Sequence, residues 1–266
     1  MKRNSVLAML VFFVFISILG VVYYKNQTGK IAGTSTEQPV VQQVSGIILP
    51  HHNLAEELIL SSFEKIKGEP YEYIVIFGPN HFVPESPTFV SADQIEHYPL
   101  ATNIIGKMRE TFPDVEVSNS LVEKEHSIML HLPSLQTYFP HAKIIPLVIS
   151  PRYQRQDLRE KINFLDATLP KNTLYIASVD FSHNMMLLEA MKKNEESIKV
   201  IQNFDYQTLL SFQDDHTDSP VSLTLLLMAM EQRKKTHWET WVSSHGALLT
   251  GDQTVQGTSY VIGVFW

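Results

Sequence analysis

The chain has 266 residues, the length of one large domain or of one domain with an appendage. Its 44% hydrophobic and 18% charged residues can fill a sizeable core, which excludes disorder over the whole chain. A formal net charge of -7 provides no basic field for binding a nucleic acid, and the absence of cysteine excludes disulfides, thiolate zinc sites and iron–sulfur clusters.

Residues 1–25 are expected to form a membrane anchor. Residues 6–24 (VLAMLVFFVFISILGVVYY) carry no charge and are long enough to cross a bilayer core at about 1.5 Å per helical residue. Lys2 and Arg3 before this run favour a cytoplasmic N-terminus. The alternative, a cleaved signal peptide, would have a shorter apolar region and a small-x-small cleavage site. We therefore expect a single-pass protein of the cell membrane whose folded domain is extracytoplasmic.

Residues 26–43 are polar and rich in Gly, Thr, Ser and Gln, which predicts a flexible linker. The pattern changes at Val44, and we expect residues 44–266 to form one domain. Short apolar runs typical of buried strands occupy residues 44–49, 73–77, 143–149 and 173–179.

Amphipathic helical patterns alternate with these strands. They occupy residues 54–67, 101–111, 155–169, 187–202 and 221–233. Such alternation predicts a three-layer α/β/α domain, in which helices cover both faces of a mostly parallel central sheet. At the C-terminus, residues 238–249 and 259–265 flank a Thr-Gly-Asp turn at 250–252, which predicts an antiparallel ribbon added to the sheet.

Histidines follow three of the four predicted buried strands. His51 follows the first, His81 the second, and Asp180 and His183 follow the strand at 173–179. Ligands bind outside the carboxyl ends of the strands in open α/β sheets. One such histidine can be structural, but three at one edge favour a site, and neutral imidazole is the commonest side-chain metal ligand. The sequence therefore predicts a metal site at this edge.

A further histidine cluster lies at residues 123–133 (EKEHSIMLHLP). His126 and His131 are five residues apart rather than four, so they do not form the one-face ligand pair of a zincin helix. Glu125 and His126 are candidates to orient a metal ligand or to transfer a proton. The spacing fits equally well a helix that begins with a charged first turn.

The segment at 214–220 (DDHTDSP) precedes an apolar helical pattern. Ser219 or Asp218 is expected to cap that helix, with Pro220 in its first turn. Capping leaves Asp215 and His216 without a role, and either could supply a third metal ligand from the loop.

Four segments resemble motifs of the Memo family in order and spacing. They are IILPH at 47–51, FGPNH at 77–81, EHSIMLHLP at 125–133 and SVDFSH at 178–183. The resemblance covers about residues 44–266 and is closest to the bacterial and archaeal branch called AmmeMemoRadiSam system protein B. It implies a fold similar to that of the class III extradiol ring-cleavage dioxygenases, which use non-haem iron.

The resemblance also implies a metal ion held by His51, His81 and a third ligand before a late helix. In animal members that ligand is the cysteine of a Cys-Gly-Arg-His-Pro run, and aligning its proline with Pro220 places His216 at this position. Asp215 is the rival and would give two histidines and one carboxylate. Iron(II) or copper is the expected ion, and zinc is also compatible with such ligands.

Three further residues belong to the pocket that the resemblance implies. They are Asp180, His183 and His126, where either histidine would transfer protons and Asp180 would orient a histidine.

The function expected from these features is that of a metal-dependent oxidoreductase or dioxygenase-like enzyme acting on an unknown small molecule or protein. The alternatives are a non-enzymatic extracytoplasmic module that binds copper or iron, and a zinc hydrolase. The name of the resembling branch further implies a functional link to radical SAM and AMMECR1-like proteins.

Overall fold

The computed structural model describes residues 43–84, 88–150, 153 and 157–266. The predicted membrane anchor at 1–25 and all but the last residue of the predicted linker at 26–43 lie outside this range. Within it, the helices are too short or too polar to cross a membrane.

The described residues build one eight-stranded sheet with the order β4-β3-β5-β2-β6-β1-β8-β7. The strands are β1 (Gly46–Leu49), β2 (Tyr73–Pro79), β3 (Phe89–Ser91), β4 (Val115–Val117), β5 (Lys143–Ile149), β6 (Thr173–Ser178), β7 (Trp238–His245) and β8 (Ser259–Phe265). The four central strands, β5, β2, β6 and β1, are parallel to one another. Their carboxyl ends therefore lie at one edge of the sheet.

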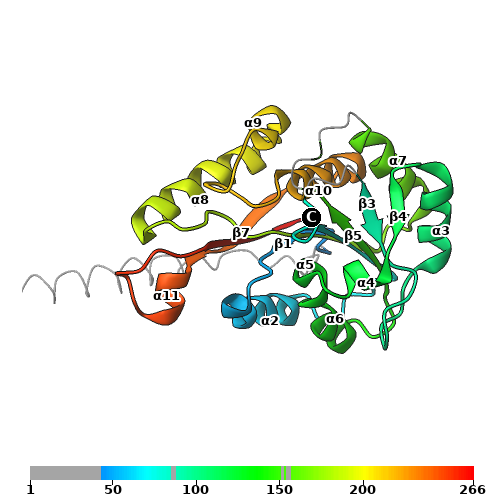
Figure 1. The fold of residues 1–266 in the computed structure, drawn as a ribbon, viewed down its shortest axis with the longest axis horizontal. Coiled ribbons are helices and arrows are strands. Elements are labelled where there is room, and N and C mark those ends of the chain that lie inside the picture. Colours follow the sequence, from blue (N-terminus) through cyan, green and yellow to red (C-terminus); the bar gives the residue numbers. More distant parts are fainter. Residues whose placement is uncertain (1–42, 85–87, 151–152, 154–156) are drawn as a thin grey trace, which may run out of the picture. The chain divides into compact units, whose positions relative to one another are not determined.

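Helices cover both faces of the sheet (Figure 1). They are η1 (Asn53–Ala55), α2 (Glu56–Lys65), α3 (Thr102–Thr111), α4 (Asn119–Val122), α5 (His126–Met129), α6 (Leu132–Tyr138), α7 (Leu158–Thr168), α8 (Leu187–Gln202), α9 (Tyr206–Leu210), α10 (Pro220–Arg233) and α11 (Gly246–Thr250). Helices α7, α8 and α10 pack on one face, whereas α2 and α6 pack on the other.

The central strands are apolar throughout because each contributes to a core on both faces. In β2, Val75 and Phe77 enter the core beneath α7 and α10, and Ile74 and Ile76 enter the core beneath α2 and α6. Alternate side chains of a strand point to opposite faces, so only an uninterrupted apolar run can fill both cores. The predicted α/β domain with a mostly parallel sheet is thus confirmed.

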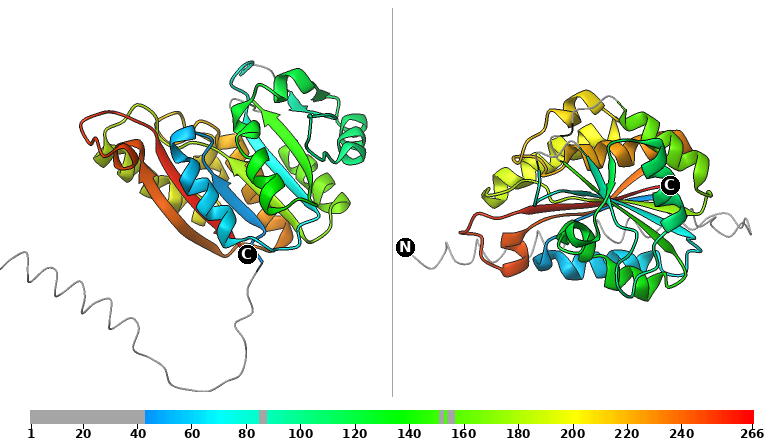
Figure 2. Two further views of the ribbon diagram at one scale, coloured as in Figure 1. Left: turned by 90° about the horizontal axis from the view of Figure 1, so that it is seen from below. Right: turned by 45° about the vertical axis from the view of Figure 1, so that its right-hand side comes forward.

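The C-terminal ribbon is also confirmed, with one correction at its first strand. β7 pairs antiparallel with β8, and β8 pairs antiparallel with β1, as Figure 2 shows for the red and blue strands. The predicted strand at 238–249 ends at His245, because residues 246–250 form α11. The side chain of His245 accepts a hydrogen bond from the backbone N–H of Ala247 and so caps this helix.

Candidate metal centre

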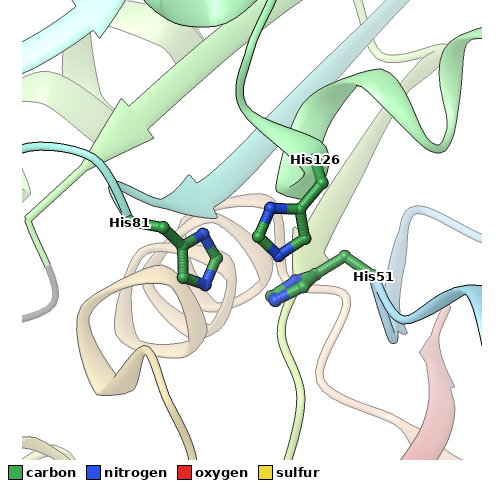
Figure 3. Close-up of side chains that lie close together, drawn as sticks. All are labelled: His51, His81 and His126. Carbon is green, nitrogen blue, oxygen red and sulfur yellow. The ribbon is translucent and has the colours of Figure 1, made fainter.

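The candidate site lies where the neighbouring strands β2, β6 and β1 end. His51 lies two residues after β1, His81 two residues after β2, and Asp180 two residues after β6. These strands are adjacent and parallel, so their turns meet at one edge of the sheet. Figure 3 shows the rings of His51 and His81 turned toward each other and toward His126, the first residue of α5.

His51 is the buried member of this histidine group. Its backbone N–H donates to Asp180 Oδ1 over 3.1 Å, and its ring Nδ1 lies 3.3 Å from Ser178 Oγ. Its other ring nitrogen, Nε2, lies 2.9 Å from Asp218 Oδ2 and 3.9 Å from Asp180 Oδ2. Every polar atom of this side chain therefore faces a polar atom of the protein.

A buried carboxylate fixes the orientation of His81. Glu125 Oε1 accepts from Nδ1 of the ring over 2.7 Å, and Oε2 accepts from the backbone N–H of His81 over 2.9 Å. This hydrogen bond keeps the proton of the neutral ring on Nδ1 and leaves the lone pair of Nε2 available. A histidine that binds a metal through Nε2 requires this tautomer. Burial would raise the pKa of Glu125, but the hydrogen bonds from His81 and from the N–H of Ser127 outweigh it and lower the pKa.

The close approach of α5 to β2 explains how Glu125 reaches His81. A Cβ atom at Gly78 would lie 2.5 Å from Ser127 Oγ and 2.9 Å from its Cβ, closer than real contacts allow. The missing side chain lets Ser127 pack against the end of β2 and donate to the carbonyl of Pro79 over 3.0 Å. The Gly-Pro pair before Asn80 and His81 therefore sets the distance between the strand and the helix that carries Glu125.

His126 lies at the open side of the group. Its ring stacks on that of His81 with centroids 4.2 Å apart, and it meets the ring of His51 edge-on at 5.1 Å. Partial burial, followed by the charges of His81 and His51, lowers the pKa of His126. This shift favours the neutral form of the ring.

Asp218 reaches the site from the loop before α10. Ser219 caps that helix, because its side chain accepts from the N–H of Ser222, and Pro220 occupies the first turn. Asp218 is therefore not needed as the cap. Its backbone N–H donates to the carbonyl of Asp180 over 3.1 Å, and its Oδ1 accepts from the N–H of Asp180 over 3.2 Å. These reciprocal hydrogen bonds direct Oδ2 toward His51.

Oδ2 of Asp218 is a buried acceptor that lacks a hydrogen bond from any described residue. It forms an ion pair with Nε2 of His51 over 2.9 Å and lies 4.0 Å from Nε2 of His81. A buried carboxylate oxygen beside two ring nitrogens is costly unless a cation or a proton occupies the space between them. The donor set therefore fits a metal ion.

Two groups of three described residues have donor atoms within 4.8 Å of one another. The first is His51, His81 and His126, and the second is His51, Asp180 and Asp218. His51 belongs to both groups. The predicted ligands His51 and His81 are thus brought together, and the predicted pocket residues Asp180 and His126 lie beside them.

The loop residues predicted as third ligands lie elsewhere. The ring of His216 stacks on Phe212 at 4.1 Å, with Nδ1 2.9 Å from Asp215 Oδ1 and Nε2 3.2 Å from Glu196 Oε2. Asp215 also pairs with Lys193 over 2.7 Å. Neither His216 nor Asp215 belongs to a metal-capable group of described residues, because their side chains are engaged with α8.

His183 lies near Asp180 without entering either group. Its backbone N–H donates to the carbonyl of Asp214 over 2.9 Å, and its Nδ1 is buried without a hydrogen-bond partner among the described residues. Burial raises the pKa of Asp180, and the charge of His51, with a smaller contribution from His183, counteracts this rise.

Asp218 is the site residue that the sequence interpretation assigned to another role. A helix needs one N-cap residue, and Ser219 provides it for α10. The sequence holds a second residue of the capping type, Asp218, beside it, and this surplus was a signal that Asp218 has a different role. Ser178 and His131 lie behind the ring of His51. The spacing of these two residues in the sequence does not identify them as site residues.

Most of the described domain corresponds to a known family. Residues 23–260 match the family described as Memo-like protein, and the chain belongs to that family.

Three relatives agree with this assignment. The chain is 24% identical over 207 residues to a MEMO1 family protein of Metallosphaera sedula, covering 74% of this chain and 71% of the relative. It is 27% identical over 197 residues to one of Aquifex aeolicus, covering 63% of this chain and 52% of the relative. It is 28% identical over 202 residues to one of Thermotoga maritima, covering 69% of each.

A solved structure supports the fold alone. The uncharacterized protein JW3007 from Escherichia coli K12 superposes with a TM-score of 0.55 at 12% sequence identity, covering 83% of this chain and 99% of that chain.

The ionisation of His51 predicts a pH-dependent stability of the metal-free protein. Burial alone would lower the pKa of His51, but the charges of Asp218 and Asp180 outweigh it and raise the pKa to about 9. A raised pKa stabilises the folded state fully below pH 6.5, and this contribution is lost as the pH rises through about 9. We expect a loss on the order of 3 kcal/mol, measured by urea unfolding with a chelator present.

The control for this measurement is His51→Gln, in which this part of the pH dependence should be absent. The same substitution at exposed His141 should leave the wild-type profile unchanged. A wild-type profile that runs parallel to that of His51→Gln between pH 6.5 and 9.5 would contradict the assignment.

Proposed function

We propose that this Memo-family protein is a metal-dependent oxidoreductase of the dioxygenase-like kind, whose metal ion is held by His51, His81 and Asp218. The observation that carries the proposal is the position of Oδ2 of Asp218, a buried carboxylate oxygen that lies 2.9 Å from Nε2 of His51 and 4.0 Å from Nε2 of His81. Donor atoms that share an ion at about 2.0–2.2 Å lie no more than about 4.4 Å apart. Asp218 thus meets the distance requirement toward both histidines, and the proposed set combines His51 and His81 of one group with Asp218 of the other.

The donor set favours iron(II) as the ion. Two imidazoles and one carboxylate are the ligands typical of non-haem iron(II) enzymes, whereas copper(I) prefers thiolates and thioethers. Copper(II) and zinc are the competing ions. A bound iron(II) would supply one-electron chemistry and Lewis acidity at this point of the site.

The residues around the donors have distinct tasks in this proposal. His126, neutral and partly exposed, accepts a proton from a substrate that enters from the open side. Glu125 keeps the proton of His81 on Nδ1, and Asp180 holds the turn that carries His51. The buried side of the site excludes water, which strengthens these electrostatic interactions.

The test of the function is metal analysis of anaerobically purified protein, followed by oxygen uptake with catechol-like substrates. We expect about one iron per chain and substrate-dependent oxygen consumption that His126→Ala reduces by about 100-fold or more. Stoichiometric copper or iron without any turnover would instead support a non-enzymatic metal-binding module. Protein without stoichiometric metal would overturn the proposal.

The ligand set is tested by four alanine variants measured side by side. His51→Ala and Asp218→Ala should each weaken metal binding by more than about 100-fold. Loss of a residue that only orients a ligand costs about 10- to 100-fold, and loss of a ligand should cost more. His216→Ala and Asp215→Ala should retain the metal, because these side chains contact α8 rather than the site. Circular dichroism serves as the folding control. If His216→Ala loses the metal while Asp218→Ala keeps it, the three-histidine site that the sequence predicts is the right one.

We also propose that residues 1–25 anchor the chain and that the domain is extracytoplasmic. The support is the uncharged run at 6–24 preceded by Lys2 and Arg3. Protease added to intact cells or spheroplasts should therefore degrade the domain, whereas a cytoplasmic marker stays intact. A domain that is protected until the membrane is lysed would contradict this orientation.

A further inference from the structure

Behind His51, away from the open side, lies a buried pair of polar side chains that the proposed ligand set does not include. Ser178 Oγ lies 3.3 Å from Nδ1 of His51 and 2.9 Å from Nε2 of His131. Ser178 and His131 are both fully buried. The serine hydroxyl therefore connects the two imidazole rings in one continuous hydrogen-bonded row.

Stability alone does not account for this row. Nδ1 of His131 is buried without a hydrogen-bond partner among the described residues, and the ring of Phe63 lies edge-on to His131 at 6.4 Å. An unpaired buried polar atom costs about 1–3 kcal/mol. An apolar side chain in the place of His131 would avoid this cost, so the imidazole is explained by what it does for Ser178.

The direction of the hydrogen bonds decides which atom of His51 is available to a metal. A neutral imidazole carries one N–H, and Nε2 can bind a metal only when that hydrogen is on Nδ1. Nδ1–H then donates to Ser178 Oγ, and the hydroxyl hydrogen of Ser178 must turn to its other neighbour. That neighbour is Nε2 of His131, which has to be an acceptor.

The surroundings of His131 keep its ring neutral, so Nε2 is able to act as an acceptor. Complete burial, and then the charge of His51, lower the pKa of His131 to about 3, so this ring is neutral. In the reverse direction, His131 would donate to Ser178, Ser178 would donate to Nδ1 of His51, and the proton of His51 would lie on Nε2. That arrangement blocks the metal.

We infer that Ser178 and His131 are positioning residues for the metal centre: Ser178 accepts the Nδ1–H of His51 and donates to His131, which holds His51 in the tautomer that presents Nε2. This inference rests on the proposed role of His51 as a metal ligand. It assigns to the second histidine of the 125–133 segment a role at the site that involves no contact with the metal.

The first test uses full-length wild-type protein with ¹⁵N-labelled histidine, loaded with zinc(II) as a diamagnetic probe. Long-range ¹H–¹⁵N correlation spectra distinguish the two imidazole tautomers. We expect both His51 and His131 to carry their hydrogen on Nδ1, with the signals assigned through His51→Gln and His131→Phe. A hydrogen on Nε2 of His131 would overturn the inference, and the tautomers themselves are measured in the wild-type protein.

The second test compares zinc(II) affinities. Ser178→Ala should weaken binding by about 10- to 100-fold, as expected for the loss of a partner that orients a ligand. Ser178→Thr keeps the hydroxyl and should restore most of the affinity. The matched control is Ser62→Ala, since Ser62 is a buried serine whose hydroxyl donates to the carbonyl of Leu58 in α2.

The two proposals fail in different ways. If His51→Ala abolishes zinc binding but Ser178→Ala binds zinc like wild type, the positioning role is wrong and the metal site stands. If His51→Ala itself binds zinc like wild type, the metal site is wrong and the positioning role falls with it.

Discussion

The burial of the His51 ring is the constraint on which the rest of the site depends. An imidazole removed from water needs a partner for each nitrogen, because an unpaired buried polar atom is costly. The protein provides Ser178 at Nδ1 and Asp218 at Nε2, from the end of β6 and from the loop before α10. The parallel pairing of β1 with β6 places Ser178 beside this ring, and the loop before α10 adds Asp218.

The histidines differ in how firmly the fold holds them. His51 is enclosed on all sides, whereas the side chains of His81 and His126 are 33% and 53% exposed. The exposed position of His81 would leave its ring free to rotate. The fully buried Glu125 fixes it by accepting hydrogen bonds from both the ring and the backbone N–H of His81. The site therefore has one rigid, deep donor and an open side lined by stacked rings, where a substrate can approach without rearrangement of the sheet.

The sequence predicts the sheet and two of the ligands because both follow from local rules. Apolar runs mark the central strands, and the carboxyl-edge rule singles out His51 and His81. The third donor depends instead on the path of the loop before α10. There Phe212 stacks on His216, and Phe181 pairs with Thr217 in an isolated bridge, which turns Asp218 toward the site. The bridge between Phe181 and Thr217 joins residues far apart in the chain, and no spacing within 214–220 encodes it.

The same geometry relates the metal-free site to the proposed metal-bound one. With a pKa of about 9, His51 carries two protons near neutral pH, one facing Ser178 and one facing Asp218. An incoming divalent ion has to replace only the proton on Nε2, between the ring and the carboxylate. The hydrogen bonds on the Nδ1 side, through Ser178 to His131, keep their direction. The positive charge of the imidazolium thus holds Asp218 and Asp180 in place in the absence of a metal, so the exchange requires no new arrangement of the loops.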